Sequence, residues 1–401
     1  MNKSFLFLSI FISSVFTLPL FSQELKFSGE AGSIWAAAIG SENRGDLLLG
    51  DVWLNGKFEA FYGNSCVYAE GRVGFDDVES QTYKELKEIY LDYTADFFAF
   101  RAGRQKAVWG KADGIDITNV ICPKDYSSTR ALFDDENLAI DGLRLSLNKG
   151  SLCADFYYIP FFTPASLPKK QEAQLSSVDL PQKNLKNSEY GVKVSGYFSI
   201  LDFSFYGFYG FEDSPFLDYS LSEQGLKADG CYKKMAMLGA DAAVPVKNLV
   251  FRLEGAFFPK RHFQSTGEKI LLGSKNTEEH NNVLALAGLD WMPESWTFTA
   301  QYFCDYVFKK NDNLERENSL QHGVTFSLSK SLFAQTLELS AAAVLMLNDL
   351  DSAIELSAEY SLSDSIFLEA GGNLFNEGKE PGTYGSYKNY TSLYLKARYV
   401  F

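Results

Sequence analysis

The sequence has few histidines and cysteines, and it has no long apolar run beyond about its first 22 residues. The three histidines, His262, His280 and His322, are scattered, and the five cysteines show no CxxC spacing, so no metal site is expected. An odd, dispersed set of cysteines also argues against a disulfide framework, although a pair between Cys122 and Cys231 stays open. Without a second run of roughly 20 apolar residues, the mature chain is not expected to cross a membrane by helices.

The chain also lacks the patterns of catalysis and of nucleic-acid binding. No nucleophile elbow or catalytic spacing of Ser, His and Asp stands out, so we expect neither an enzyme nor a bound cofactor. The net charge of -14 argues against nucleic acid as a partner and fits solvated acidic loops. Hydrophobic residues make up 46% and aromatic residues 15% of the chain, a profile that suits apolar residues distributed by alternation.

The beginning of the chain has the layout of an export signal. Lys3 precedes an apolar run that starts at Phe5 and continues to Leu18, and the small residue Ser22 precedes Gln23. We therefore expect residues 1–22 to be a cleaved signal peptide and residues 23–401 to form one mature domain.

The end of the chain alternates between two kinds of side chain. Across 392–401 one face carries Leu393, Leu395, Ala397, Tyr399 and Phe401, and the other carries Lys396 and Arg398. An apolar outer face, a charged inner face and a terminal aromatic are typical of a strand in a transmembrane β-barrel. The ending resembles the C-terminal assembly signal of Gram-negative outer-membrane proteins, with Tyr399 and Phe401 as its aromatic residues.

Similar alternation recurs through the whole mature chain. The segments lie at about 25–39, 47–62, 65–76, 84–94, 96–106, 138–148, 151–160, 188–198, 200–210, 232–245, 248–259, 281–292, 294–308, 319–329, 331–347, 352–361, 364–375 and 388–401. Every second connection is very short, as at 63–64 and 363–364, and most of the others are long and polar, as at 107–137. The pattern predicts an all-β fold, an antiparallel up-and-down transmembrane barrel of about 18 strands (16–18), with both termini on the periplasmic side.

A barrel of this size has a lumen too wide for its own side chains to fill, so inward charges gain importance. Early strands contribute inward bases interleaved with acids: Lys57, Glu59, Glu70, Arg72, Arg101, Arg144 and Arg252. Later strands contribute only acids, among them Glu338, Glu355, Glu359 and Glu369, until Lys396 and Arg398 return beside the first strand. The sequence thus predicts a mixed basic wall that faces an acidic wall across the lumen.

The most specific local signal is the run from Arg101 to Tyr126, in which a strand leads into a loop rich in Gly, Trp, Lys and Asp. It resembles the G-R-Q-x-x-x-W-G…N-x-x-x-P-x-D segment of porin-like outer-membrane families that include phosphate-selective and alginate-export porins. The resemblance implies a loop folded against the lumen wall and anchored by Trp109, with its charged residues near the passage: Arg101, Arg104, Lys106, Lys111, Asp113 and Lys124. A structural latch, in which Arg104 pairs with Asp113 or Asp116, is the alternative.

These patterns together predict an outer-membrane channel of a diderm bacterium that gives passive passage to small polar solutes, with a loop near 107–137 as its constriction. A surface-exposed structural or adhesin barrel without transport is the alternative. The expected partners are outer-membrane lipid, the barrel-assembly machinery and the solutes themselves. A monomer and a homotrimer both fit the sequence.

Overall fold

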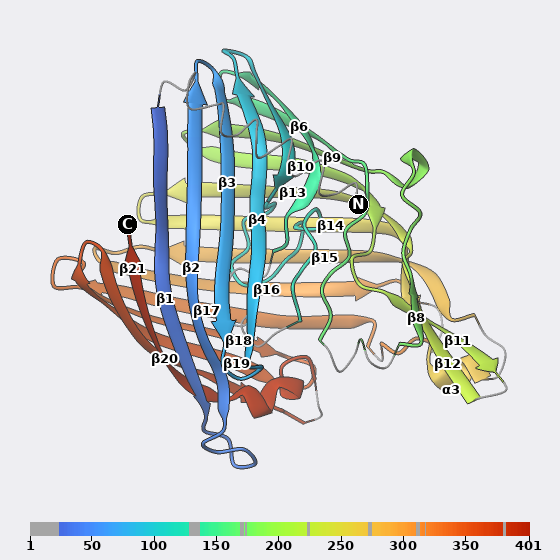
Figure 1. Ribbon diagram of the computed structural model, residues 1–401. Helices are drawn as coiled ribbons and strands as arrows, with labels where there is room; N and C mark the ends of the chain where they lie inside the picture. The colour runs from blue at the N-terminus through green and yellow to red at the C-terminus, as the bar shows by residue number, and fades with distance from the viewer. Residues whose placement is uncertain are drawn as a thin grey trace, which may run out of the picture.

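The chain folds into a closed ring of 18 antiparallel strands (Figure 1). The computed structural model describes residues 24–401 apart from 128–136, 169–171, 173–174, 223–224, 272–274, 310–312, 317 and 380–381. The predicted signal peptide, residues 1–22, lies outside the described residues.

The ring is built almost entirely in sequence order. Its strands are β1 (Glu24–Ala38), β2 (Leu47–Tyr62), β3 (Ser65–Asp76), β4 (Gln81–Thr94), β5 (Phe98–Gln105), β6 (Ile140–Lys149), β7 (Leu152–Ile159), β9 (Glu189–Phe198), β10 (Leu201–Phe211), β13 (Lys234–Val246), β14 (Leu249–Gln264), β15 (Thr277–Trp291), β16 (Trp296–Val307), β17 (Leu320–Leu332), β18 (Leu337–Met346), β19 (Ser352–Ser363), β20 (Ile366–Asn376) and β21 (Ser392–Val400). Each strand pairs with the next, and β21 pairs with β1, so the ring is closed.

The strand prediction is confirmed, because each of the 18 expected segments forms one strand of the ring. The closure is confirmed as well: Arg398 lies opposite Gly32, and Lys396 lies opposite Ile34. The turn expected at 329–331 is wrong and lies instead at 333–336, after a longer β17. Three consecutive residues there, Phe333, Ala334 and Gln335, have φ values of 49°, 54° and 70°, which reverse the chain.

Two of the long connections contain a second sheet that the sequence analysis missed. Strands β11 (Phe216–Ser222) and β12 (Gly225–Cys231) form a hairpin, and β8 (Ser177–Asp179) adds to β12 in parallel. The three strands project beyond one end of the barrel in Figure 1. The short helical segments η3 (Leu185–Asn187), α3 (Gly267–Leu271) and η4 (Gly385–Tyr390) also lie in long connections. No helix among the described residues is long and apolar enough to cross a membrane.

The two ends of the barrel differ in their connections. The end with short turns also holds both ends of the ring, since Glu24 lies opposite Phe61 and the backbone of Phe401 pairs with Gly29. The other end, called here the loop end, carries the connection between β5 and β6, the second sheet and η4. The predicted sorting of short and long connections is therefore confirmed.

The outer face of the barrel is apolar and carries aromatic side chains near both ends. Exposed aromatics near the short turns are Tyr62, Tyr93, Trp291, Trp296, Tyr360 and Tyr399; those toward the loop end are Trp35, Phe75, Tyr190, Tyr209 and Tyr306. Between them the outward positions are mostly Leu, Val, Phe and Ala, as in the rows Phe100–Leu145 and Ala102–Leu143. Two aromatic girdles around an apolar band are the surface that a bilayer requires of a barrel.

Each of the five cysteines is a thiol, so the disulfide between Cys122 and Cys231 that the sequence left open is not formed. Cys122 is buried, and its Sγ accepts a hydrogen bond from the backbone N–H of Ala107 at 3.2 Å. Cys231 stands at the end of β12, in the second sheet. The two residues therefore serve different parts of the structure.

Candidate functional site

The connection that follows β5 enters the barrel and packs against its inner wall. We call residues 106–126 the inner segment. Its buried residues Ala107, Trp109, Ile117, Ile121 and Cys122 form one apolar cluster with inward residues of β6, β7, β10 and β13 to β16. The cluster joins seven strands of the wall, so the segment is held by burial along most of its length.

Trp109 is the central apolar contact of the inner segment. It is only 3% exposed. Its ring lies 5.1 Å from that of Tyr206 and 5.9 Å from that of Tyr157, measured between centroids. Its backbone N–H donates to Asn119 Oδ1 at 3.1 Å, which ties the two arms of the segment together. Trp109 therefore packs the inner segment against β7 and β10 of the wall.

The main polar anchor of the inner segment is the carboxylate of Glu254 on β14. It accepts hydrogen bonds from the backbone N–H groups of Lys111 at 2.7 Å, Ala112 at 2.9 Å and Thr118 at 2.9 Å. The Thr118 hydroxyl donates to it as well, at 2.7 Å. Glu254 is 5% exposed, so this buried charge is compensated by four converging donors.

The close approach of the inner segment to the Glu254 carboxylate requires a glycine after Trp109. Gly110 has a φ of +92°, and a Cβ at this position would lie 2.5 Å from Glu254 Oε1. A larger residue would therefore be strained in its backbone and would displace the carboxylate. The Gly110 N–H donates to the Tyr206 hydroxyl at 3.1 Å, which adds a further link to the wall.

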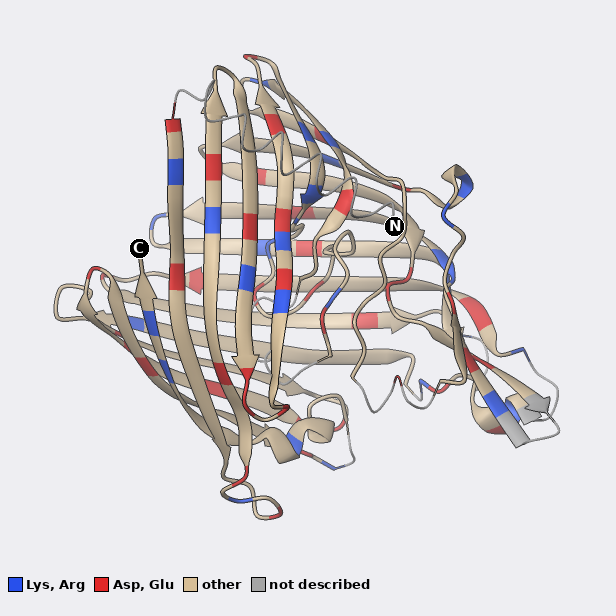
Figure 2. Ribbon diagram, viewed as in Figure 1, with Lys and Arg blue, Asp and Glu red and all other residues tan. Residues whose placement is uncertain are grey.

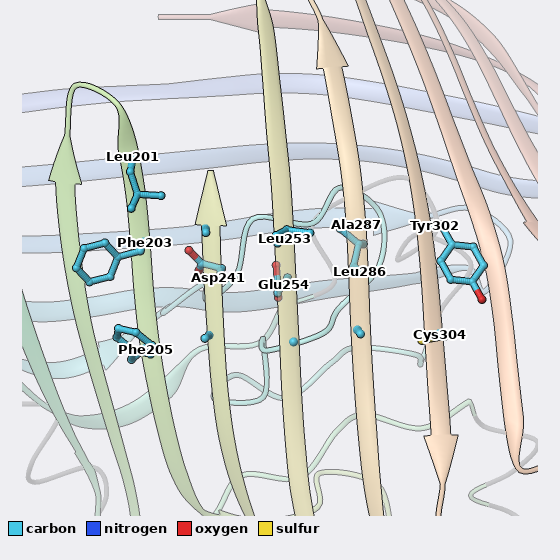
Figure 3. A pocket seen from close by; sticks show the side chains of 14 residues that line it. Leu201, Phe203, Phe205, Asp241, Leu253, Glu254, Leu286, Ala287, Tyr302 and Cys304 are labelled. Atoms are coloured by element: carbon cyan, nitrogen blue, oxygen red, sulfur yellow. The ribbon is translucent and has the colours of Figure 1, made fainter. Parts of the chain in front are cut away.

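Asp241 on β13 forms a second anchor beside Glu254. The two residues lie directly opposite each other in the strand register, and Figure 3 shows them on neighbouring strands. The ammonium group of Lys111 lies 3.1 Å from Asp241 Oδ1, and the Tyr206 hydroxyl donates to the other oxygen of Asp241. Lys111 is thus an ion-pair partner of the wall.

Arg252, two residues before Glu254, forms the third anchor. Its guanidinium lies 2.6 Å from Asp290 and 3.0 Å from Asp113, and it also donates to the Lys111 carbonyl at 2.7 Å. Arg252 therefore joins the wall carboxylate of Asp290 to the tip of the inner segment. Asp113 is more than half exposed, so it reaches the solvent of the lumen.

The latch predicted between Arg104 and Asp113 or Asp116 is wrong. Asp113 pairs with Arg252, and Asp116 pairs with Lys124 at 2.6 Å. Arg104 instead pairs with Asp141 through two hydrogen bonds of 2.8 Å. Arg104 follows Ala102 on the outer face of β5, opposite Asp141 on β6, so it does not line the passage.

The other predicted pore residues of this region lie on the inner face or at the start of the inner segment. Arg101 is inward and donates to Asp92 at 2.6 Å, with its guanidinium 3.8 Å from the Tyr90 ring. The backbone N–H of Lys106 donates to the inward carboxylate of Glu88 at 2.6 Å. Arg144 is inward and lies directly opposite Arg101.

Most of the predicted lumen charges have an ion-pair or hydrogen-bond partner. Arg72 pairs with Asp51 at 3.2 Å, and Glu70 accepts hydrogen bonds from Asn55 and Tyr68. On the acidic side, Glu369 lies 3.6 Å from Lys396, and Glu359 lies 2.5 Å from Arg398. The charges of both predicted walls are visible along the strands of Figure 2.

A smaller set of lumen charges has no such partner. Within the described part of the chain, no carboxylate forms an ion pair with the inward bases Lys57 and Arg144. In the same way, no base pairs with Glu59, Glu338 or Glu355, and the last two are exposed. Fewer charged side chains than the sequence predicted therefore contribute to the electric field across the lumen.

The groove drawn in Figure 3 belongs to the outer face. It has a volume of about 680 Å³ and is lined by outward residues of β10 and β13 to β16, among them Phe203, Leu253 and Tyr302. Its floor is formed by small residues that leave space between the larger side chains: Ala240, Ala242, Gly255, Ala285 and Ala287. Asp241 and Glu254 lie behind this floor, on the inner side.

The closed ring with an inner segment was compared with known proteins. No family model matches the chain, and no curated protein matches it in sequence. Among solved structures, Pseudomonas aeruginosa OccK2 (OpdF) matches with a TM-score of 0.59 and 10% identity, over 95% of this chain and 99% of that chain. The chain has the fold of the OccD/OprD outer-membrane porins.

Two further structures give the same result. Pseudomonas aeruginosa OccK8 (OprE) matches with a TM-score of 0.58 and 9% identity, over 95% of this chain and 98% of that chain. Acinetobacter baumannii OccAB1 matches with a TM-score of 0.56 and 9% identity, over 95% and 97%. At such low identity the likeness concerns the fold, and the site rests on this chain's own residues.

The role of the wall residues that hold the segment was not predicted from the sequence. Nothing in the alternation of β14 marks Glu254 as an acceptor for four donors some 140 positions earlier in the chain. Asp241 was not singled out at all. One feature of the sequence does mark Asp241: it is an inward acid in a strand of mostly small residues, and a buried acid needs a compensating donor.

Proposed function

We propose that this chain is an outer-membrane channel of porin type through which small polar solutes diffuse passively. The observation that carries the proposal is the inner segment, held inside an 18-stranded ring by Glu254, Asp241 and Arg252. Barrels of this strand number enclose an aqueous lumen, and a loop packed inside reduces its cross-section. We take the inner segment as the constriction.

The same proposal places the protein in the outer membrane of a diderm bacterium. The short-turn end, where β1 begins and β21 ends, would face the periplasm, and the loop end would face the outside. Its partners would be outer-membrane lipid, the barrel-assembly machinery and small polar solutes, and both a monomer and a homotrimer are compatible with the surface. The structure of OccK2 in complex with glucuronate supports a polar solute of small size.

Conductance of the refolded protein in planar bilayers tests the channel directly. We expect discrete, ohmic steps in potassium chloride, because charged lumen residues such as Arg144 and Glu355 line a hydrated path. A heat-denatured sample of the same protein is the control for detergent artefacts. Absence of steps from a sample that circular dichroism shows to be folded would favour the alternative, a structural or adhesin barrel plugged by its loops.

The two arginines of β5 should differ in their effect on ion selectivity. Arg101→Glu removes one positive charge from the inner wall and adds one negative charge, and we expect the reversal potential in a salt gradient to shift toward cation preference. Arg104→Glu makes the same charge change on the outer face and should leave the reversal potential unchanged. An equal shift for both variants would contradict the assigned faces.

The aromatic at the chain end should matter for assembly more than for the folded barrel. The Phe401 backbone exchanges hydrogen bonds of 3.0 and 2.9 Å with Gly29, which fastens the seam between β21 and β1. Phe401→Ala keeps these bonds, so we expect slower folding by the assembly machinery in cells but normal thermal stability after refolding. Tyr360→Ala, another exposed girdle aromatic, is the control. Equal losses for both variants in heat-shift gels would refute a signal specific to Phe401.

A further inference from the structure

A cavity of about 690 Å³ lies among the loops at the loop end of the barrel. Its walls come from four connections: Tyr126 from the inner segment, Leu167 and Leu175 from the β7–β9 connection, Tyr219 from β11 in the β10–β13 connection, and Tyr387 from η4. Such a volume is within the range of small-molecule binding sites.

The cavity lies over the mouth of the barrel, as the strand order shows. The connection that carries Tyr219 leaves the ring between β10 and β13, and the connection that carries Tyr387 leaves it between β20 and β21. These two gaps are eight strands apart in a ring of 18, which is almost diametrically opposite. Loops that meet from opposite sides of the ring must meet above the lumen.

The walls of the cavity are tied together by backbone and side-chain contacts. The N–H of Tyr126 donates to the carbonyl of Ser166 at 2.8 Å, next to Leu167. Leu217 is held at both its N–H and its carbonyl by the amide of Gln264, at 2.9 and 3.1 Å. The ring of Tyr387 packs 5.8 Å from that of Phe375. These contacts tie residues from several walls of the cavity to neighbouring elements.

The lining has a distinct chemical character. It combines three tyrosines with leucines and prolines; the residues are Tyr126, Leu167, Pro168, Leu175, Ser214, Pro215, Leu217, Tyr219, Ala228 and Tyr387. None of these described residues is charged, so a charged solute would lose hydration there without a compensating partner. Tyrosine rings offer flat apolar faces together with hydroxyl groups at their edges.

We propose that this cavity, called here the tyrosine pocket, is a docking subsite for uncharged sugar rings. A sugar ring presents C–H faces that lie flat on tyrosine rings and hydroxyl groups that exchange hydrogen bonds with phenolic and serine hydroxyls. The proposal deepens the proposed function, on which it rests: sugars would dock above the lumen before they pass the inner segment. Uncharged aromatic solutes are the competing ligand that the test must separate.

Binding is measured on the refolded protein in detergent, independently of conductance. Saturation-transfer NMR with maltose should show transfer to ring protons, and titration calorimetry should give its affinity. We expect Tyr219→Ala and Tyr387→Ala each to weaken maltose binding by roughly three- to tenfold, the effect of losing one aromatic contact. Tyr387→Phe keeps the ring and should weaken binding less than Tyr387→Ala does.

Control solutes and variants distinguish sugar binding in the tyrosine pocket from other kinds of binding. Phe308→Ala removes an exposed loop aromatic that does not line the pocket, and it should leave maltose affinity unchanged. Glucuronate carries a carboxylate on the same type of ring and should bind more weakly than glucose. Stronger binding of phenol than of maltose, no maltose binding, or equal affinities in all variants would overturn the proposal. Maltose binding without conductance would support the proposed tyrosine pocket and contradict the proposed channel.

Discussion

Replacing Glu254 with alanine is expected to free the inner segment from the wall and to raise single-channel conductance. The carboxylate is the shared acceptor for three backbone N–H groups and one hydroxyl. Without it, these donors are left without an acceptor, and each buried donor that loses its partner costs about 1–3 kcal/mol. The free-energy difference that favours the docked state of the inner segment over an undocked state should therefore become much smaller.

Conductance and proteolysis measure this release together. We expect Glu254→Ala to give larger and noisier conductance steps than the wild type and faster cleavage within residues 106–126 by a protease added in detergent. Glu254→Gln, which keeps one acceptor oxygen, should lie between the two. Glu70→Ala is a matched control, because Glu70 is also an inward, hydrogen-bonded carboxylate but touches no part of the segment. Wild-type conductance and cleavage in Glu254→Ala would show that the apolar cluster alone holds the segment.

The barrel could be predicted from the sequence because its main determinant is local. A residue such as Leu145 between Arg144 and Ser146 is placed outward by the pleat of its own strand, and closure then follows from the need to pair every edge. The same alternation also predicts the outward face that Arg104 occupies. Arg101 faces inward, and a position three residues later in a strand faces outward, but the resemblance placed Arg104 near the passage together with the loop residues.

The anchoring of the inner segment could not be predicted, because it depends on contacts across the lumen. Asp113 was expected to pair with a base near it in sequence, yet its partner Arg252 lies 139 positions away. Which strand stands behind a loop depends on the strand count, the shear of the barrel and the path of the loop. None of these is encoded in a short pattern, so the resemblance of the Trp-Gly segment indicated a fold-back without identifying its partners.

The same distinction explains the lumen charges. Alternation placed Glu359, Glu369, Lys396 and Arg398 on the inner face, but neutralisation depends on register. In the structure Lys396 lies opposite Glu369 across one strand pair, and Arg398 reaches Glu359. Of the acidic wall predicted on β18 to β20, only the carboxylates that do not pair with Lys396 or Arg398 of β21 therefore remain uncompensated.

Those remaining carboxylates should dominate cation selectivity. Glu338 on β18 and Glu355 on β19 are exposed on the inner face, and among the described residues no base forms an ion pair with either. We expect Glu338→Lys with Glu355→Lys to shift the reversal potential strongly toward anion preference, because the change of four charges is uncompensated within the lumen. The shift should be larger at about 0.1 M than at about 1 M salt, since screening shortens the reach of lumen charges.

The control for this double variant changes charge where ions do not pass. Lys84 is exposed and faces outward on β4, opposite Val73, so Lys84→Glu should leave the reversal potential unchanged. Glu359→Gln tests the role of pairing: it leaves Arg398 without its closest carboxylate and should shift selectivity toward anions by less than the double variant does. If the double variant keeps wild-type selectivity while Arg101→Glu changes it, selectivity is set beside the inner segment, and the wall of β18 and β19 lies outside the narrow part of the passage.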